Sequence, residues 1–383
     1  VIGHETGQDQ MYPDTADIHL YTGVTKPHNF IVYQKRLDDA GMGDLSHKYF
    51  KDSGALAAIC NREEIESALR TKNYGGFQLL DIQDFPGQGC ALVGVLNAYF
   101  KPKGVISQKE WHQFCSEVVP LLRYPEFTLT SNDTFEGRVQ VANYGPKAIS
   151  KSVNWSINDD NGKNVSKGTF GLKEIPQGNL YDIGTLSYNL SGITCAQKLN
   201  ITISIEDTEY ENTYSIWVYT ANVETDESKV RVFTSFNEDA QKALKKGKKV
   251  LILPTPDVLP TSVDGAFQSD FWNYNMFKKY GNVGTMGILT DETNPVFADF
   301  PTEYHSNWQW FRLLRYGRPI NLASLPKSYR PIVQVIDNFV LNRKLGVLFE
   351  AKVGKGKLMV CSMALEENMK YPEGKQMYVS ILN

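Results

Sequence analysis

The strongest candidate for chemistry is a glutamate that directly follows an apolar start. Glu5 comes after residues 1–4, Val-Ile-Gly-His, which have the pattern of a buried strand that ends at a functional tip. In a TIM barrel, the active site lies at the mouth formed by the carboxyl ends of the strands. A carboxylate at the end of such a strand therefore lies in the active site. There it can attack an anomeric carbon, because a buried, hydrogen-bonded carboxylate is a usable nucleophile for an oxocarbenium-like centre. The alternative is an ordinary surface glutamate.

Further polar side chains, near Glu5 and near a second strand-like run at residues 75–82, suit a hydroxyl-rich ligand. The candidates for substrate binding are His4, Gln8, Tyr12, Gln78, Asp81 and Asp84. Histidine and glutamine can hydrogen-bond to a polyol, and Tyr12 can orient Glu5 or stack on a sugar ring. Asp81 and Asp84 either hold sugar hydroxyls or cap a loop. Both interpretations of this aspartate pair stay open.

Other motifs in the chain do not support a different chemistry. Cys361 lies in the apolar run 358–362 without a Gly-x-Cys-x-Gly elbow, which favours a buried structural thiol over a nucleophile. Residues 354–357, Gly-Lys-Gly-Lys, lack the spacing of a phosphate-binding loop. The sequence has no His-x-x-x-His pair, so we expect neither a metal site nor a cofactor. The aromatic stretch 308–312 can stack on a sugar, although core packing is the simpler explanation.

Length and composition exclude several protein classes. The chain has 383 residues, enough for two or three domains, and its 42% hydrophobic and 22% charged residues are typical of globular proteins. A net charge of −3 and the lack of a basic half argue against nucleic-acid binding. The apolar runs are far shorter than the roughly 20 residues of a membrane helix, so we expect no membrane span. Five widely spaced cysteines have the pattern of buried thiols.

The pattern of apolar residues changes twice and divides the chain into three domains. Residues 1–123 have the pattern of strand, long helices, strand and helix, which is typical of βα units with a parallel sheet. Residues 124–222 show short alternating runs separated by Asn-Gly and Asp-Asn turns, which predict an antiparallel β-sandwich. Residues 223–383 return to a mixture of strands and helices.

Local signals place several elements within these domains. Ser107 and Glu110 form a capping box that predicts a helix over residues 110–122. In the third domain, the spacing of apolar residues predicts helices over 237–246 and 332–340. The glycines near residue 355 predict a hairpin between two late strands.

Two segments of the first domain resemble glycoside hydrolase family 2, which contains β-galactosidases and β-glucuronidases. Residues 4–8, His-Glu-Thr-Gly-Gln, resemble its nucleophile strand, in which an apolar strand runs into a glutamate followed by glycine. Residues 75–85 resemble its last barrel strand, with Leu80 where the family usually has a sugar-stacking tryptophan. The run 86–94 is similar to family-2-like proteins of polysaccharide-degrading gut Bacteroidetes.

This resemblance implies a fold of three parts. Residues 1–123 would be the C-terminal part of a (β/α)8 TIM barrel, and residues 124–222 an immunoglobulin-like sandwich. Residues 223–383 would be a flavodoxin- or amidotransferase-like α/β domain without catalytic function. The protein would belong in the periplasm or outside the cell.

The implied activity is that of a retaining exo-β-glycosidase that removes terminal β-linked sugars, β-galactosides first, from oligo- or polysaccharides. Glu5 would be the nucleophile. Because the acid/base glutamate of the family lies on an earlier strand, we expect a preceding N-terminal segment of the same protein to supply it. The expected partners are this segment and the carbohydrate substrate, and a homo-oligomer is compatible with the sequence. The alternative is a non-catalytic carbohydrate-binding or scaffold protein.

Overall fold

The structure is a computed structural model that describes residues 1–85, 87–259, 262–263, 267, 269–273 and 284–383. The chain forms two compact units, each assembled from segments that are separated in the sequence. The first unit comprises Val1–Gly7, Ile59–Leu80 and Ile106–Asn222, and the second comprises Gln8–Ala58, Asp81–Val105 and Val223–Asn383. Residues 1–123 are therefore shared between the two units.

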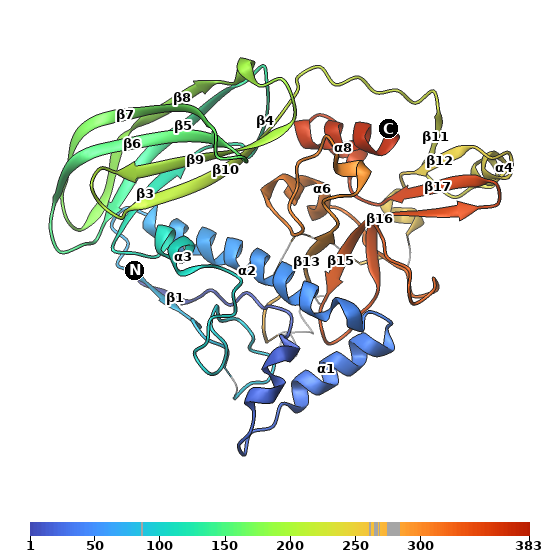
Figure 1. The fold of residues 1–383 in the computed structure, drawn as a ribbon, viewed down its shortest axis with the longest axis horizontal. Coiled ribbons are helices and arrows are strands. Elements are labelled where there is room, and N and C mark those ends of the chain that lie inside the picture. The colour runs from blue at the N-terminus through green and yellow to red at the C-terminus, as the bar shows by residue number, and fades with distance from the viewer. Residues whose placement is uncertain (86, 260–261, 264–266, 268, 274–283) are drawn as a thin grey trace. The chain divides into compact units, whose positions relative to one another are not determined.

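The first unit is built on two β-sheets that enclose one apolar core (Figure 1). One sheet has the strand order β3-β5-β8, and the other has the order β4-β10-β9-β6-β7. The strands are β3 (Val118–Arg123), β4 (Thr128–Thr130), β5 (Thr134–Asn143), β6 (Ile149–Asp159), β7 (Asn164–Ile175), β8 (Asn179–Asn189), β9 (Gln197–Ile205) and β10 (Glu211–Tyr219). Neighbouring strands run antiparallel except β4 and β10, which run parallel. The 3-10 turn η3 (Leu190–Gly192) follows β8.

Alternation of side chains explains why these segments become strands. In β9, Leu199, Ile201, Ile203 and Ile205 are buried, while the residues between them are partly exposed. Successive side chains of a strand point to opposite faces, so this period of two gives one apolar and one polar face. The apolar face meets the equivalent face of the other sheet, which forms the core of the unit.

Shorter elements of the first unit pack on the outer face of one sheet. They are β1 (Gly3–Thr6), β2 (Phe77–Leu79), α3 (Gln108–Phe114) and the last part of α2 (Ser46–Leu69). Ile65 and Leu69 of α2 join Phe114 of α3 in a cluster with residues of β3, β5 and β8. The capping box at Ser107 is confirmed. The predicted extent of its helix is wrong, because residues 118–123 form β3 instead.

A buried carboxylate connects α2 to the sandwich within the first unit. The Glu66 side chain is fully buried and accepts hydrogen bonds from Arg62, Arg70, Asn212 and Tyr214 at 2.5–3.0 Å. A charge taken out of water is tolerated only when it is paired and hydrogen-bonded. The four donors meet this requirement, so the last part of α2 is anchored to β10 by charge as well as by apolar packing.

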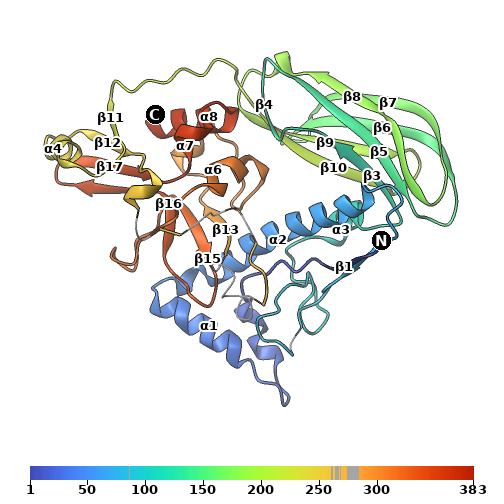
Figure 2. The ribbon, with the colours of Figure 1, turned by 180° about the vertical axis from the view of Figure 1, so that it is seen from behind.

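The second unit contains a seven-stranded mixed sheet with the order β11-β12-β17-β16-β15-β13, and β14 pairs with β16. The strands are β11 (Val230–Phe233), β12 (Lys249–Ile252), β13 (Thr285–Thr290), β14 (Ile320–Asn321), β15 (Val333–Asp337), β16 (Leu345–Val353) and β17 (Gly356–Cys361). The pairs β11-β12 and β12-β17 are parallel, and the other pairs are antiparallel. Helix α4 (Glu238–Lys245) lies against one face of the parallel part (Figure 2).

Besides α4 and the first part of α2, the second unit contains several α-helices and 3-10 turns. They are η1 (Thr15–Leu20), α1 (His28–Asp39), η2 (Gly43–Leu45), η4 (Pro256–Val258), η6 (Pro295–Phe297), η7 (Trp308–Trp310), α6 (Phe311–Arg315), α7 (Leu365–Asn368) and α8 (Pro372–Leu382). Within the described part of the chain, no helix combines the length and the apolar character that crossing a bilayer requires.

Local predictions for the third sequence segment have mixed outcomes. The helix after Asn237 is confirmed as α4, and the Asn237 side chain accepts a hydrogen bond from the Ala240 N–H as its cap. The hairpin near residue 355 is confirmed as the antiparallel pair β16-β17. The helix predicted over 332–340 is wrong, because Val333–Asp337 forms β15 and is buried throughout. A short apolar run that is buried on both faces has no periodicity that separates strand from helix.

The predicted TIM barrel is wrong. Within the described ranges, β1 and β2 form a separate sheet of two strands, and no ring of eight alternating strands and helices occurs. The strand and helix pattern of residues 1–123 comes from elements that belong to two different units. The flavodoxin-like description of the third segment also needs correction, because its sheet is largely antiparallel. The fold is strand-rich, with several separate sheets.

The second unit contains a buried acid whose ionisation should weaken folding. Asp52 of α2 is 2% exposed, and its Oδ2 atom has no hydrogen-bond partner among the described residues. Burial raises its pKa from 3.8 to about 8, although Lys48 opposes the shift. Because the native state holds a proton that the unfolded state has lost above pH 4, stability should fall as the pH rises from 4 to 8.

We therefore expect Asp52→Asn to stabilise the second unit by about 3–4 kcal/mol more at pH 8 than at pH 5, since the amide carries no charge to bury. Urea unfolding followed at both pH values measures the difference. An unchanged pH dependence in the variant would contradict the assignment of this acid.

Candidate functional site

Glu5 lies in an irregularity of the parallel pair β1-β2. Gly3 pairs with Phe77 and Thr6 with Leu79, so three steps along β1 match two steps along β2. This mismatch is a β-bulge, a feature that redirects side chains and often occurs beside active sites. Glu5 has a φ of 59°, in the left-handed region that residues other than glycine seldom adopt. Such a conformation costs about 1–2 kcal/mol and marks Glu5 as a candidate for function.

His4 and Gln78 bring two more polar side chains to Glu5. His4 Nδ1 lies 2.8 Å from Gln78 Oε1 across the strand pair, and His4 Nε2 lies 3.4 Å from Glu5 Oε1. An imidazole with hydrogen on both nitrogens would donate to both oxygens. The side chains of His4 and Glu5 are 73% and 48% exposed, so an external ligand can reach them. The structure thus brings together three of the predicted site residues.

The turn after Glu5 is held by Glu64 of α2, a residue that sequence reasoning missed. The Gly7 N–H donates to Glu64 Oε2 at 2.7 Å. Gly7 has a φ of 82°, and a Cβ atom there would lie 2.4 Å from Asn61 Oδ1, so the position requires glycine. Glu64 is therefore a positioning residue for the Glu5 turn, and Asn61 leaves no room for a side chain at residue 7. No sequence motif relates them to residue 7, because the contact depends on the packing of α2 beside β1.

Tyr12 belongs to the core of the second unit. Its side chain is 2% exposed, and its hydroxyl donates to Asn342 Oδ1 at 2.8 Å. Its ring makes edge contacts with Tyr49 and Phe339, and burial raises the pKa of its phenol. The prediction that Tyr12 orients Glu5 or stacks on a sugar is therefore wrong.

Asp84 forms a buried ion pair in the second unit. Lys103 Nζ lies 2.5 Å from Asp84 Oδ1, and the Gly94 N–H donates to the same oxygen at 3.1 Å. Burial raises the pKa of the Asp84 carboxyl, and the Lys103 ammonium opposes that shift. Of the two interpretations of Asp84, the structure contradicts sugar binding and agrees with a role in holding the loop.

Two further predicted residues, Gln8 and Asp81, also belong to the second unit. Gln8 accepts a hydrogen bond from Trp272 Nε1 at 2.7 Å. Asp81 is half-buried and follows β2 by two residues. Neither residue is part of a metal site, since no three histidine, cysteine, aspartate or glutamate side chains gather suitably within the ranges that the structure describes.

Two candidate residues of the third sequence segment, Cys361 and Trp310, lie in the core. Cys361 is fully buried, and burial raises the pKa of its thiol to about 12, which removes thiolate character at neutral pH. Trp310 is also fully buried and packs against Phe297 and Phe300. The expectation of buried thiols holds fully only for Cys361, since Cys60, Cys90 and Cys115 are partly exposed and Cys195 is exposed.

Two parts of the chain match models of known domain families. Residues 231–383 match a domain of unknown function (DUF8487), and residues 133–220 match another domain of unknown function (DUF8488). These matches cover the α/β part and the sandwich, and neither includes Glu5. No curated protein matches the sequence.

Similar solved structures cover parts of the chain. A Paenibacillus cycloisomaltooligosaccharide glucanotransferase is 17% identical, with a TM-score of 0.22, over 32% of this chain and 17% of its own. A Listeria innocua β-glucosidase is 11% identical, with a TM-score of 0.21, over 27% and 16%. A CARDB domain of Pyrococcus furiosus is 16% identical, with a TM-score of 0.21, over 27% and 93%. These similarities are too low to carry an argument about function.

Proposed function

We propose that this protein acts on carbohydrates as a glycoside hydrolase and that Glu5 is its nucleophile. The observation that supports this proposal is the placement of the Glu5 carboxylate in a bulge of β1, exposed and 3.4 Å from His4. Sugar hydroxyls need groups that both donate and accept hydrogen bonds, and His4 and Gln78 supply them beside the carboxylate. The resemblance of residues 4–8 and 75–85 to family 2 favours β-linked substrates, with β-galactosides first.

The chemistry assigned to Glu5 is attack on an anomeric carbon. One carboxylate oxygen forms a bond to that carbon as the bond to the leaving oxygen breaks, and water later hydrolyses the glycosyl ester. His4 Nε2, which faces Glu5, can donate to the carboxylate and fix its orientation. Gly7 and Glu64 hold the backbone that places Glu5 there. In this scheme the strained conformation of Glu5 serves to direct its carboxylate.

A second candidate function is carbohydrate binding without catalysis. The observation in its favour is exposure, because the Glu5 side chain is 48% accessible and reactive carboxylates usually work in water-poor surroundings. A binding site needs only the hydrogen-bonding groups of His4, Glu5 and Gln78. The two functions differ in one measurable property, the formation of a covalent bond to Glu5.

The test is covalent labelling with 2,4-dinitrophenyl 2-deoxy-2-fluoro-β-galactoside. Its leaving group departs without a general acid, so the reagent examines Glu5 alone, and the fluorine slows hydrolysis of the glycosyl ester. We expect peptide mass spectrometry to find one fluoroglycosyl group on Glu5. Galactose binding without any label would favour the second function, and a label on another residue would overturn the assignment of the nucleophile.

A further inference from the structure

Three lysines stand side by side across three neighbouring strands of the second unit. Lys249 of β12 is the register partner of Lys357 of β17, which in turn is the partner of Lys352 of β16. Register partners point to the same face of a sheet, and adjacent strands are about 4.8 Å apart. The opposite face carries the apolar residues that pack against α4. This lysine row therefore lies on the face away from α4.

Like charges in direct cross-strand register weaken a sheet, so the lysine row needs an explanation other than stability. All three side chains are exposed, and none forms an ion pair with a carboxylate within the described residues. Lys355, in the turn between β16 and β17, adds a fourth exposed ammonium group nearby. The result is a concentration of positive charge in a chain whose net charge is −3.

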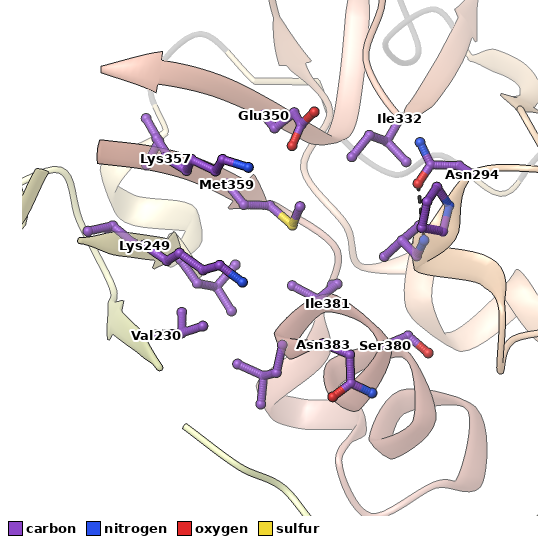
Figure 3. A pocket seen from close by; sticks show the side chains of 16 residues that line it. Val230, Lys249, Asn294, Ile332, Glu350, Lys357, Met359, Ser380, Ile381 and Asn383 are labelled. Atoms are coloured by element: carbon purple, nitrogen blue, oxygen red, sulfur yellow. Dashed lines mark hydrogen bonds between the residues drawn. The ribbon is translucent and has the colours of Figure 1, made fainter. Parts of the chain in front are cut away.

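Two lysines of the row, Lys249 and Lys357, line a pocket together with several apolar side chains and Glu350 (Figure 3). The pocket has a volume of about 360 Å³, which is in the range of small-molecule sites. In Figure 3 the side chains of Lys249 and Lys357 extend in the same direction, into the pocket that Met359 and Ile381 also line. Leu251, Met359 and Glu350 form the next row of the same face, and Ile381 of α8 closes the opposite side.

A second hollow of about 840 Å³ continues from this pocket and shares four lining residues with it, Asn294, Ile332, Glu350 and Lys357. It is also lined by Lys352, Lys355 and Arg330, and Arg330 is already paired with Asp44. Among the described residues, the acidic side chains along the two hollows are Glu350 and Asp291. Four lysines thus face two carboxylates, which leaves an excess of positive charge beside the apolar side chains.

We propose that this pocket binds an ester of phosphate or sulfate whose organic part has an apolar face. Lys249 and Lys357 would hold the tetrahedral anion, because two ammonium groups about one strand spacing apart can converge on its oxygens. Leu251, Met359 and Ile381 would contact the organic part. The site belongs to the second unit and does not depend on the function proposed for Glu5.

The test is calorimetric titration of the complete chain at low salt with phenyl phosphate, phenyl sulfate and the neutral benzyl alcohol. We expect one or both esters to bind with a Kd of about 1 mM or tighter, and benzyl alcohol to bind far more weakly. The ester that binds more tightly identifies the anion. Affinity for the ester should fall as salt is added, because the lysines are exposed.

The test also uses variants that are expected to change the affinity for the ester in opposite directions. A folding defect could not explain both changes. Lys249→Gln combined with Lys357→Gln should weaken ester binding at least about tenfold, because charge-assisted hydrogen bonds are lost. Glu350→Gln should tighten binding about threefold, since it removes a neighbouring negative charge. Lys245→Gln on α4 removes one lysine charge from the other side of the sheet and should change nothing. Equal binding by the wild type and the double variant, or no binding of either ester, would overturn the proposal.

Discussion

Glu5→Gln is expected to lower the rate of hydrolysis of 2,4-dinitrophenyl β-galactoside by at least about a thousandfold, because the amide cannot form the glycosyl ester. The variant keeps the size and hydrogen-bonding reach of the side chain, so His4 and Gln78 should keep their places. The measurement is the steady-state release of dinitrophenol, with kcat and KM determined separately. We expect the loss in kcat, since Glu5 reacts only after the sugar is bound.

A matched control for this experiment is Glu136→Gln, which removes an exposed carboxylate from β5 of the same unit. Its rate should equal that of the wild type. A Glu5→Gln variant that hydrolyses the substrate as fast as the control would refute the nucleophile assignment. If the variant also retains galactose binding, non-catalytic carbohydrate recognition becomes the better description of the site.

The second large effect is expected at the buried cluster around Glu66. Glu66→Ala should destabilise the first unit by about 3–5 kcal/mol, because it removes the buried carboxylate that Arg62 and Arg70 share. Arg62 and Arg70 are only 22% and 18% exposed, so water can replace little of what the carboxylate provides. Hydrogen exchange at the amides of β9 and β10 measures the stability of this unit separately from the other.

The control for this second prediction lies on the same helix. The Glu63 carboxylate is one-third exposed and lies 3.7 Å from Arg70, so Glu63→Ala should cost less than about 1 kcal/mol. If the two variants lost similar amounts of hydrogen-exchange protection, the buried cluster would contribute no more to the stability of the first unit than a surface ion pair does. That result would also remove the charge-based explanation for the anchoring of α2 to β10.

Local sequence signals were sufficient for elements that depend on neighbouring residues. The period of two in β9 follows from the alternation of side chains in a strand. The helix α4 follows from a cap at Asn237, and the β16-β17 hairpin follows from the glycines of its turn. Each of these signals acts within a few residues, so the sequence alone determines it. The buried strand predicted before Glu5 is wrong, because Val1 and Ile2 are exposed, and the role of Glu5 stays a prediction.

Only the tertiary structure decided which of these pieces come together. Residues 1–123 have the local pattern of a barrel, but their apolar faces pack in two separate units, and that choice depends on partners more than a hundred residues away. Tyr12 is buried by Phe339, and Gly7 is held by Glu64, although nothing adjacent in the sequence indicates either contact. The lysine row arises because strand register aligns residues 249, 352 and 357. Register and packing are set by long-range burial of apolar surface, which local propensity does not encode.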